Sequence, residues 1–407
     1  MPINIVNQVL MILRNRSIIL ILALNFVFYC SMSQVNSKKS VPQNDITYSQ
    51  LMQSASIKLT SHEYASALRD FSLAFKHHDS IGKYDYANAM LAAYNVDSIS
   101  LALTWFSKGV ELGLGLSNGE YEYFNNANDF PGLKDQPSYQ LSLIQILEKV
   151  NRQKSDKNLI DKQWLDRIEK NGKNGKHAID STNIGFSLYW NDSGDNKVPY
   201  LVYIPKSAIS RENIKTIVYL HGGVVSTSEF TFRESATSSE PIFKVADSLG
   251  FVVIYPFGKK SYGWVDQLEA FHQILDIVKE TKQKYALAED NLYLGGMSNG
   301  GTATFWFASQ SETPFKSFFT FSGNYELKVD SIHWEKIDEL RSIYSFNASD
   351  DNIFSKDNIE RQYSEKSAIA PGWHLEMINS GGHGFIYDPT ALNSFLIPFF
   401  KRFLNIN

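Results

Sequence analysis

The residues best suited to carry out chemistry lie in the segment Gly296-Met297-Ser298-Asn299-Gly300. Ser298 follows a short apolar run and precedes a stretch with helical periodicity, so we expect a sharp turn between a strand and a helix. Such a turn leaves no room for side chains at its flanking positions, which explains the glycines, and it exposes the serine hydroxyl in a strained conformation. The spacing and its context predict that Ser298 is a nucleophile.

A second glycine-containing turn follows the apolar run Ile217–Leu220 and reads His221-Gly222-Gly223. Glycines leave the backbone accessible where a substrate must approach closely. The N–H of Gly222 or Gly223, together with the N–H of Asn299, would stabilise an oxyanion during acyl transfer. We expect His221 itself to bond within the loop and to take no part in proton transfer.

The base and the acid that would serve Ser298 are expected later in the chain. His383 lies among glycines in Asn379-Ser-Gly-Gly-His-Gly-Phe385, after the last apolar run, where its imidazole can reach another strand end. A carboxylate should orient that imidazole, and it should fall between serine and histidine in the chain. Asp350 and Asp351 both follow an apolar run, and we predict Asp350 as the acid, with Asp351 as the alternative.

The elements that must position these residues begin at about residue 183. Short β-rich runs alternate with amphipathic helices, which is typical of a doubly wound, mostly parallel sheet covered on both faces. The predicted strands are Tyr200–Ile204, Thr216–Leu220, Phe251–Tyr255, Asn291–Leu294, Ser317–Phe321, Ser342–Phe346 and His374–Ile378, and the clearest helices are Pro241–Leu249 and Val265–Tyr285. Ligands bind beyond the carboxyl ends of such strands, where all of the candidate residues lie.

The preceding part of the chain, residues 46–150, is predicted to be all-helical and repetitive. Residues 67–75 align with residues 102–110 at an offset of 35 residues, with apolar or small side chains at helical spacing. This arrangement resembles a tetratricopeptide repeat. A groove for a protein partner is one interpretation, but aromatic residues that form the core of a small helical domain are the favoured one. Residues 151–182 are polar and predict a solvated linker before a catalytic domain at 183–407.

The catalytic motifs resemble those of the α/β-hydrolase superfamily. They are most similar to the esterases grouped with secreted polyhydroxybutyrate depolymerases and feruloyl esterases, through Tyr200–Pro205, His221–Gly223, Gly250–Pro256 and the Gly295–Gly301 turn. The order Ser298, Asp350, His383 matches that superfamily. The His-Gly pair that often precedes the acid in the family is absent here. The resemblance implies an α/β-hydrolase fold and a serine esterase, and prolyl-oligopeptidase-like peptidases share the same turn and order.

The first residues are expected to be a targeting segment. Arg14 and Arg16 precede an apolar stretch of 12 residues, Ile18–Tyr29, which is shorter than the roughly 20 residues of a membrane-spanning helix. Small residues near position 33 predict a signal peptide over residues 1–33 and hence an exported protein. Cys30, the single cysteine, leaves a lipoprotein anchor as an alternative.

Composition narrows the function classes that remain. The formal net charge is −4, without a basic domain, so a nucleic-acid partner is not expected. The chemistry outlined above requires no metal and no organic cofactor. We therefore predict an exported hydrolase of small or polymer-linked carboxylic esters. A peptidase of the same fold, or an inactive interaction protein that binds partners through its helical repeats, is the alternative.

Overall fold

A computed structural model describes residues 47–76, 81–117, 119–126, 130–174, 178–194, 196–209, 211 and 213–406. The expected signal peptide and Cys30 lie outside the described residues. The chain divides into two compact units between Asp156 and Lys157, a boundary that falls inside one long helix. Within the described parts, no helix combines the length and the apolar character needed to cross a membrane.

The N-terminal unit is helical, as the sequence predicts. Four helices form two consecutive pairs that contact each other through α3 and α4. The pairs are α2 Tyr48–Thr60 with α3 Tyr64–Ala74, and α4 Lys83–Tyr94 with α5 Ile99–Glu111. The 35-residue offset of the sequence repeat relates α3 to α5, which begin at residues 64 and 99. Two short helices, α6 Glu120–Asn125 and α7 Pro131–Lys134, precede the long helix α8 Pro137–Asn174. The aromatic side chains Phe71, Phe106, Phe130 and Tyr139 are buried in this unit's own core, as expected of a small helical domain.

The prediction of a polar linker at residues 151–182 is wrong for its first 24 residues, because helix α8 continues without a break to Asn174. Charged residues dominate this part of α8, and pairs four residues apart, such as Lys157 with Asp161, support the helix. Two apolar side chains on one face, Trp164 and Ile168, are buried in the core of the second unit. The second compact unit therefore begins at Lys157, whereas the sequence predicts a domain that begins at residue 183.

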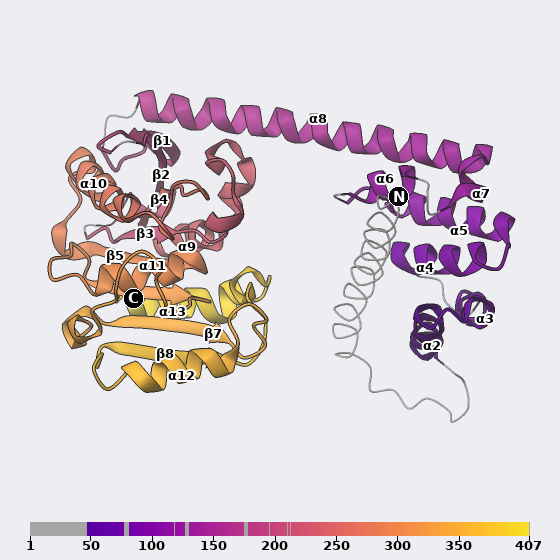
Figure 1. Cartoon of the computed structure of the whole chain (residues 1–407). Coiled ribbons are helices and arrows are strands. Elements are labelled where there is room, and N and C mark those ends of the chain that lie inside the picture. Colours follow the sequence, from indigo (N-terminus) through magenta and orange to yellow (C-terminus); the bar gives the residue numbers. More distant parts are fainter. Residues whose placement is uncertain are drawn as a thin grey trace, which may run out of the picture. The chain divides into compact units, whose positions relative to one another are not determined.

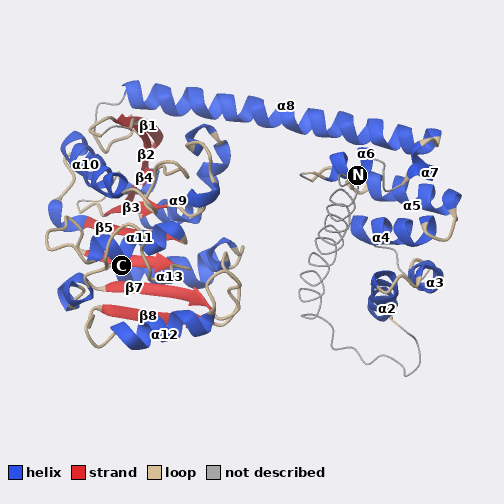
Figure 2. Ribbon diagram, viewed as in Figure 1, coloured by secondary structure: helices blue, strands red, loops and turns tan. Residues whose placement is uncertain are grey.

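The second unit is built around one eight-stranded sheet with the order β1-β2-β4-β3-β5-β6-β7-β8. Strands β3 to β8 run parallel, while β2 lies antiparallel to both β1 and β4 (Figure 2). The sequence predicted every strand except β1, within a few residues at each end. The strands are β1 Gly185–Asn191, β2 Val198–Ile204, β3 Thr216–Leu220, β4 Val252–Pro256, β5 Leu292–Met297, β6 Ser317–Phe321, β7 Ile343–Ala348 and β8 Trp373–Ile378.

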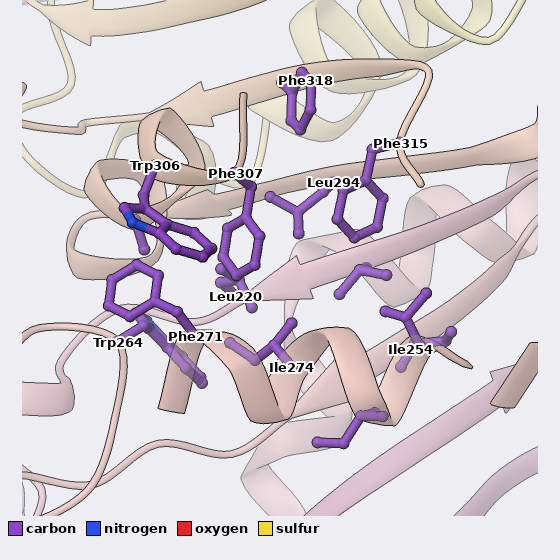
Figure 3. Packing of buried hydrophobic residues seen from close by; sticks show 14 of the residues in the cluster. Leu220, Ile254, Trp264, Phe271, Ile274, Leu294, Trp306, Phe307, Phe315 and Phe318 are labelled. Carbon is purple, nitrogen blue, oxygen red and sulfur yellow. The ribbon is translucent and has the colours of Figure 1, made fainter. Parts of the chain in front are cut away.

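Helices cover both faces of this sheet (Figure 1). On one face α10 Leu268–Tyr285, α11 Asn299–Ala308 and α12 Lys356–Lys366 contribute to a large core, part of which is seen around Phe271, Trp306 and Phe307 in Figure 3. On the other face lie α9 Pro241–Leu249, α13 Ile397–Phe403 and the end of α8. Side chains of β3 alternate between the two cores, because successive residues of a strand point to opposite faces. Because both faces of the sheet are buried, the register of its strands is fixed, and the carboxyl ends of the parallel strands lie at one edge.

Candidate active site

Ser298 lies on a strained turn between β5 and α11. Its backbone has φ 53° and ψ −116°, a conformation that costs a non-glycine residue about 1–3 kcal/mol. The turn is held from outside, because the Ser298 N–H donates to the carbonyl of Phe321 at the end of β6, at 2.9 Å. A Cβ atom at Gly300 would overlap the carbonyl oxygen of Leu220 in β3, so only glycine allows α11 to approach the sheet this closely. The turn thus presents the hydroxyl at the carboxyl end of the sheet, as predicted.

His383 reaches this hydroxyl from the loop that follows β8. Its Nε2 lies 2.8 Å from Ser298 Oγ, at hydrogen-bonding distance. The loop turns through Gly381 and Gly382, both with positive φ, and the edge-to-face contact of Phe354 supports the imidazole ring at 5.2 Å between centroids. The structure therefore brings together the two residues that the sequence singled out as nucleophile and base.

The third member of the site is Asp351, and our choice of Asp350 is wrong. Asp351 Oδ2 lies 2.8 Å from Nδ1 of His383, and the side chain of Asp351 is completely buried. Its other oxygen, Oδ1, accepts the backbone N–H groups of Ile353 and Phe354, at 2.8 and 3.0 Å. These two bonds fix the carboxylate so that the oxygen facing His383 is an acceptor.

Asp350 has a different role in the same loop. It is exposed, and its two oxygens accept the backbone N–H groups of Gly381 and Gly382, at 3.1 and 2.8 Å. Asp350 therefore ties the loop that carries His383 to the loop after β7 without touching the imidazole. Both aspartates contact the loop that carries His383, but only Asp351 bonds to the imidazole ring.

Sequence reasoning missed Ser322, which also holds the histidine loop. Ser322 is fully buried at the end of β6 with φ 47°, and its Oγ donates to the carbonyl of His383 at 2.8 Å. The only signal for it is a Ser-Gly pair directly after a strand, which predicts a turn but no partner. Ser322 thus fixes the backbone of the residue whose side chain Asp351 orients.

The His221-Gly222-Gly223 turn lies directly against the nucleophile. A Cβ atom at Gly222 would lie 3.0 Å from the Cβ of Ser298, so a side chain at this position would push against the nucleophile. The Gly258 N–H donates to Nε2 of His221 at 3.0 Å, which leaves Nδ1 to carry the proton and donate to the Gly222 carbonyl at 2.6 Å. Burial lowers the pKa of His221 to about 4, so the ring stays neutral at pH 7.

This hydrogen bond orients one peptide group of the turn. The carbonyl of Gly222 points at His221, and the N–H of Gly223 in the same planar peptide therefore points away from the ring. Gly222, Gly223 and Asn299, the three expected oxyanion-hole residues, all line the cavity that contains Ser298. His221 thus bonds within the loop, as its sequence context indicated.

Ser298 and His383 line a cavity of about 750 Å³, a volume within the range of small-molecule sites. Trp264 lines this cavity and is also buried in the core, where it is seen near Phe271 in Figure 3. Its indole N–H donates to the carbonyl of His221 at 3.3 Å. The charged side chains on the wall are mostly acidic: Glu234, Glu240 and Glu326, against Lys328. In the part of the chain that the structure describes, no group of three or more His, Cys, Asp or Glu side chains could hold a metal ion.

The strand order, the antiparallel β2 and the serine on the turn after β5 define the α/β-hydrolase fold. On this fold, the chain presents a hydrogen-bonded Ser298–His383–Asp351 arrangement in the order Ser, Asp, His. An arrangement of this kind can support nucleophilic acyl transfer.

Solved structures of hydrolases are similar to the chain in fold. A thermostable esterase is 18% identical with a TM-score of 0.38, and the match covers 48% of this chain and 55% of the esterase, about half of its length. A ferulic acid esterase is 16% identical with a TM-score of 0.41, over 53% of this chain and 97% of that one. An acylaminoacyl peptidase from Pyrococcus horikoshii is 15% identical with a TM-score of 0.39, over 54% and 40%. No protein-family model and no curated protein sequence matches the chain.

Proposed function

We propose that this protein is a serine hydrolase that cleaves carboxylic esters through an acyl-enzyme on Ser298. The observation that carries the proposal is the continuous hydrogen-bonded series from Asp351 through His383 to Ser298 at the wall of an open cavity. A serine hydroxyl is a weak nucleophile until a base removes its proton, and here the base is at 2.8 Å.

The reaction would proceed in two steps. His383 Nε2 takes the Ser298 proton as Oγ attacks the ester carbonyl, and buried Asp351 stabilises the imidazolium that forms. The N–H of Asn299 and the N–H of Gly222 or Gly223 stabilise the oxyanion, and the protonated His383 then gives its proton to the leaving alcohol. In the second step His383 activates a water molecule, which hydrolyses the acyl-enzyme and restores the free serine.

A serine peptidase is the second candidate, and the acidic wall of the cavity favours it. The carboxylates of Glu234, Glu240 and Glu326 would attract the free amine of a peptide N-terminus. Comparing ester hydrolysis with the hydrolysis of peptide nitroanilides ranks the two activities. An esterase is expected to hydrolyse the nitrophenyl esters and to leave the peptide nitroanilides intact, whereas a peptidase would cleave both.

A fluorophosphonate probe tests the mechanism directly, because it reacts covalently with an activated serine. The wild-type chain should label stoichiometrically and hydrolyse nitrophenyl esters, while Ser298→Ala and His383→Ala should do neither. Ser248→Ala, an exposed serine on α9, is the matched control and should label like the wild type. A folded wild-type protein that neither labels nor turns over esters would refute the proposal and favour a role in binding alone.

We also propose that the protein is exported, and that the helical unit binds a protein partner or stabilises the chain. Support for export comes from Arg14, Arg16 and the apolar stretch Ile18–Tyr29 of the sequence. The mass of the mature protein from a cell-envelope fraction tests it. A start at Gln34 would indicate signal cleavage, an acylated Cys30 would indicate a lipoprotein, and an uncut chain in the cytoplasm would contradict export.

A further inference from the structure

Glu240 is a carboxylate on the wall of the catalytic cavity that the acyl-transfer mechanism does not use. It directly precedes helix α9, and the phenol of Tyr387 donates to its Oε2 at 3.1 Å. Tyr387 follows His383 by four residues and lines the same cavity. The pair therefore joins the segment that carries His383 to the residue that precedes α9, on the wall of the cavity.

The environment of Glu240 leaves its negative charge without a counter-ion. Burial raises the pKa of this carboxyl to about 7, and the hydrogen bond from Tyr387 offsets only part of that effect. No lysine, arginine or histidine of the described residues forms an ion pair with it. A partly buried carboxylate without a cation is destabilised, and a cation that enters the cavity would relieve the cost of its ionisation.

The rest of the cavity wall suits a cation as well. Glu234 and Glu326 add negative charge, whereas Lys328 is the one lysine or arginine on the described part of the wall. Tyr255 and Trp264 also line the cavity, but both are almost fully buried and the Tyr255 ring stacks on His221, so the attraction for a cation comes from the carboxylates. A neutral ligand would gain no attraction from these negative charges, and an anionic ligand would be repelled by them.

We infer that Glu240 and Tyr387 form a subsite for a cationic group, so that the preferred substrates are esters that carry an ammonium group on their acyl or alcohol part. This inference rests on the proposed esterase function and adds the class of substrate. Glu240 supplies the counter-charge, and the Tyr387 hydroxyl donates to its carboxylate. The catalytic steps on Ser298 and His383 stay as described.

Two pairs of isosteric substrates test the inference, since each pair differs only in a quaternary nitrogen replaced by carbon. For the alcohol part, butyrylthiocholine is compared with S-(3,3-dimethylbutyl) thiobutyrate. For the acyl part, the nitrophenyl ester of 4-(trimethylammonio)butyrate is compared with that of 5,5-dimethylhexanoate. We expect the wild type to favour the cationic member of at least one pair by about 10-fold in kcat/KM, mainly through KM, which corresponds to about 1.4 kcal/mol.

Variants then assign the preference to Glu240. In Glu240→Gln the ratio of cationic to neutral rates should fall to about 1, because the amide keeps the shape and loses the charge. Glu312→Gln is the matched control: it removes one exposed carboxylate outside the cavity and should keep the wild-type ratio. A ratio is measured within one enzyme, so differences in folding or in active fraction between variants do not affect it.

A measurement on the wild-type protein tests the subsite even if the Glu240→Gln variant does not fold. Between about pH 6 and pH 8 the ratio should rise as Glu240 ionises, while any effect of pH that is common to both substrates cancels in the ratio. The groups facing Glu240 are the phenols of Tyr387, Tyr219 and Tyr255, whose pKa values burial raises, so they stay neutral in this range.

Two different failures remain distinguishable. A wild type that labels with fluorophosphonate and hydrolyses the neutral esters, but shows ratios near 1 in both pairs, would overturn the subsite and leave the esterase standing. A cationic preference that persists in Glu240→Gln would overturn the role of Glu240. A folded protein that does not label would overturn the esterase and the subsite with it.

Discussion

Replacing Asp351 by asparagine should nearly abolish activity, and the reason lies in the hydrogen bonds of its two oxygens. Oδ1 accepts two backbone N–H groups, from Ile353 and Phe354, and the side chain is completely buried. The asparagine oxygen must take over these two bonds, because an amide NH₂ there would face two donors. The NH₂ group then faces Nδ1 of His383, which must become an acceptor and carry its proton on Nε2.

The expected loss follows from this change of tautomer. An imidazole protonated at Nε2 donates to Ser298 and cannot take its proton, so the base is lost while the geometry remains. The same substitution at the orienting aspartate of a serine protease lowers kcat by about 10⁴, so we expect about 10³–10⁴-fold here, or roughly 4–5 kcal/mol in activation free energy. Steady-state hydrolysis of a nitrophenyl ester measures the loss, with circular dichroism to verify folding.

Asp350→Asn is the matched control for this prediction. Asp350 accepts two backbone N–H groups of the histidine loop and does not touch the ring, so the variant loses at most one hydrogen bond. That costs about 1 kcal/mol and should reduce kcat by less than about 10-fold. If Asp350→Asn lost as much activity as Asp351→Asn, or more, the assignment of the acid drawn from the structure would be refuted.

Three further substitutions have expected effects on stability. Gly300→Ala would place a Cβ against the Leu220 carbonyl and should destabilise the unit by at least about 1–3 kcal/mol, measured by urea unfolding; an unchanged midpoint would contradict the packing. Trp164→Ala should cost the catalytic unit about 3–5 kcal/mol in the same assay, and no loss would show that the end of α8 is dispensable. Because the folded pKa of Glu240 is raised to about 7, the native state holds its proton longer than the unfolded chain, and this group's contribution falls as pH rises from about 4.5 to 7. Glu240→Gln should therefore gain Tm relative to the wild type as pH rises from about 5 to 8, and a constant difference would contradict the raised pKa.

The parts of the site that the sequence could predict are those that local backbone chemistry encodes. A serine between glycines at a strand-to-helix junction needs no distant contact to be recognised, since the steric demands of the turn select those residues. The same holds for the glycines that bring His221-Gly222-Gly223 close to Ser298. His383 was identified because the glycines before it allow a turn at the end of the last strand.

The choice between Asp350 and Asp351 depended on contacts that no local pattern carries. The two residues are identical in type and adjacent, and β7 ends at Ala348, so strand alternation does not extend to them. Their orientations are decided by which backbone N–H groups are near: those of Ile353 and Phe354 for one, and those of the histidine loop for the other. The latter partners lie about 30 residues away in the chain, so the orientation of Asp350 is a tertiary property.

The sequence by itself determined the fold class, the strands of the parallel sheet, the helical character of the N-terminal unit, and the serine and histidine that meet. It did so because apolar periodicity and glycine placement act over a few residues. The tertiary structure alone decided that the polar stretch after residue 150 is a helix, that this helix contributes Trp164 to the catalytic core, and that Asp351 orients His383. It also placed Glu240 beside Tyr387, 147 residues later in the chain. The physical reason is the same in each case: a charged helix or a single carboxylate acquires its role from partners that only folding brings within hydrogen-bonding or packing distance.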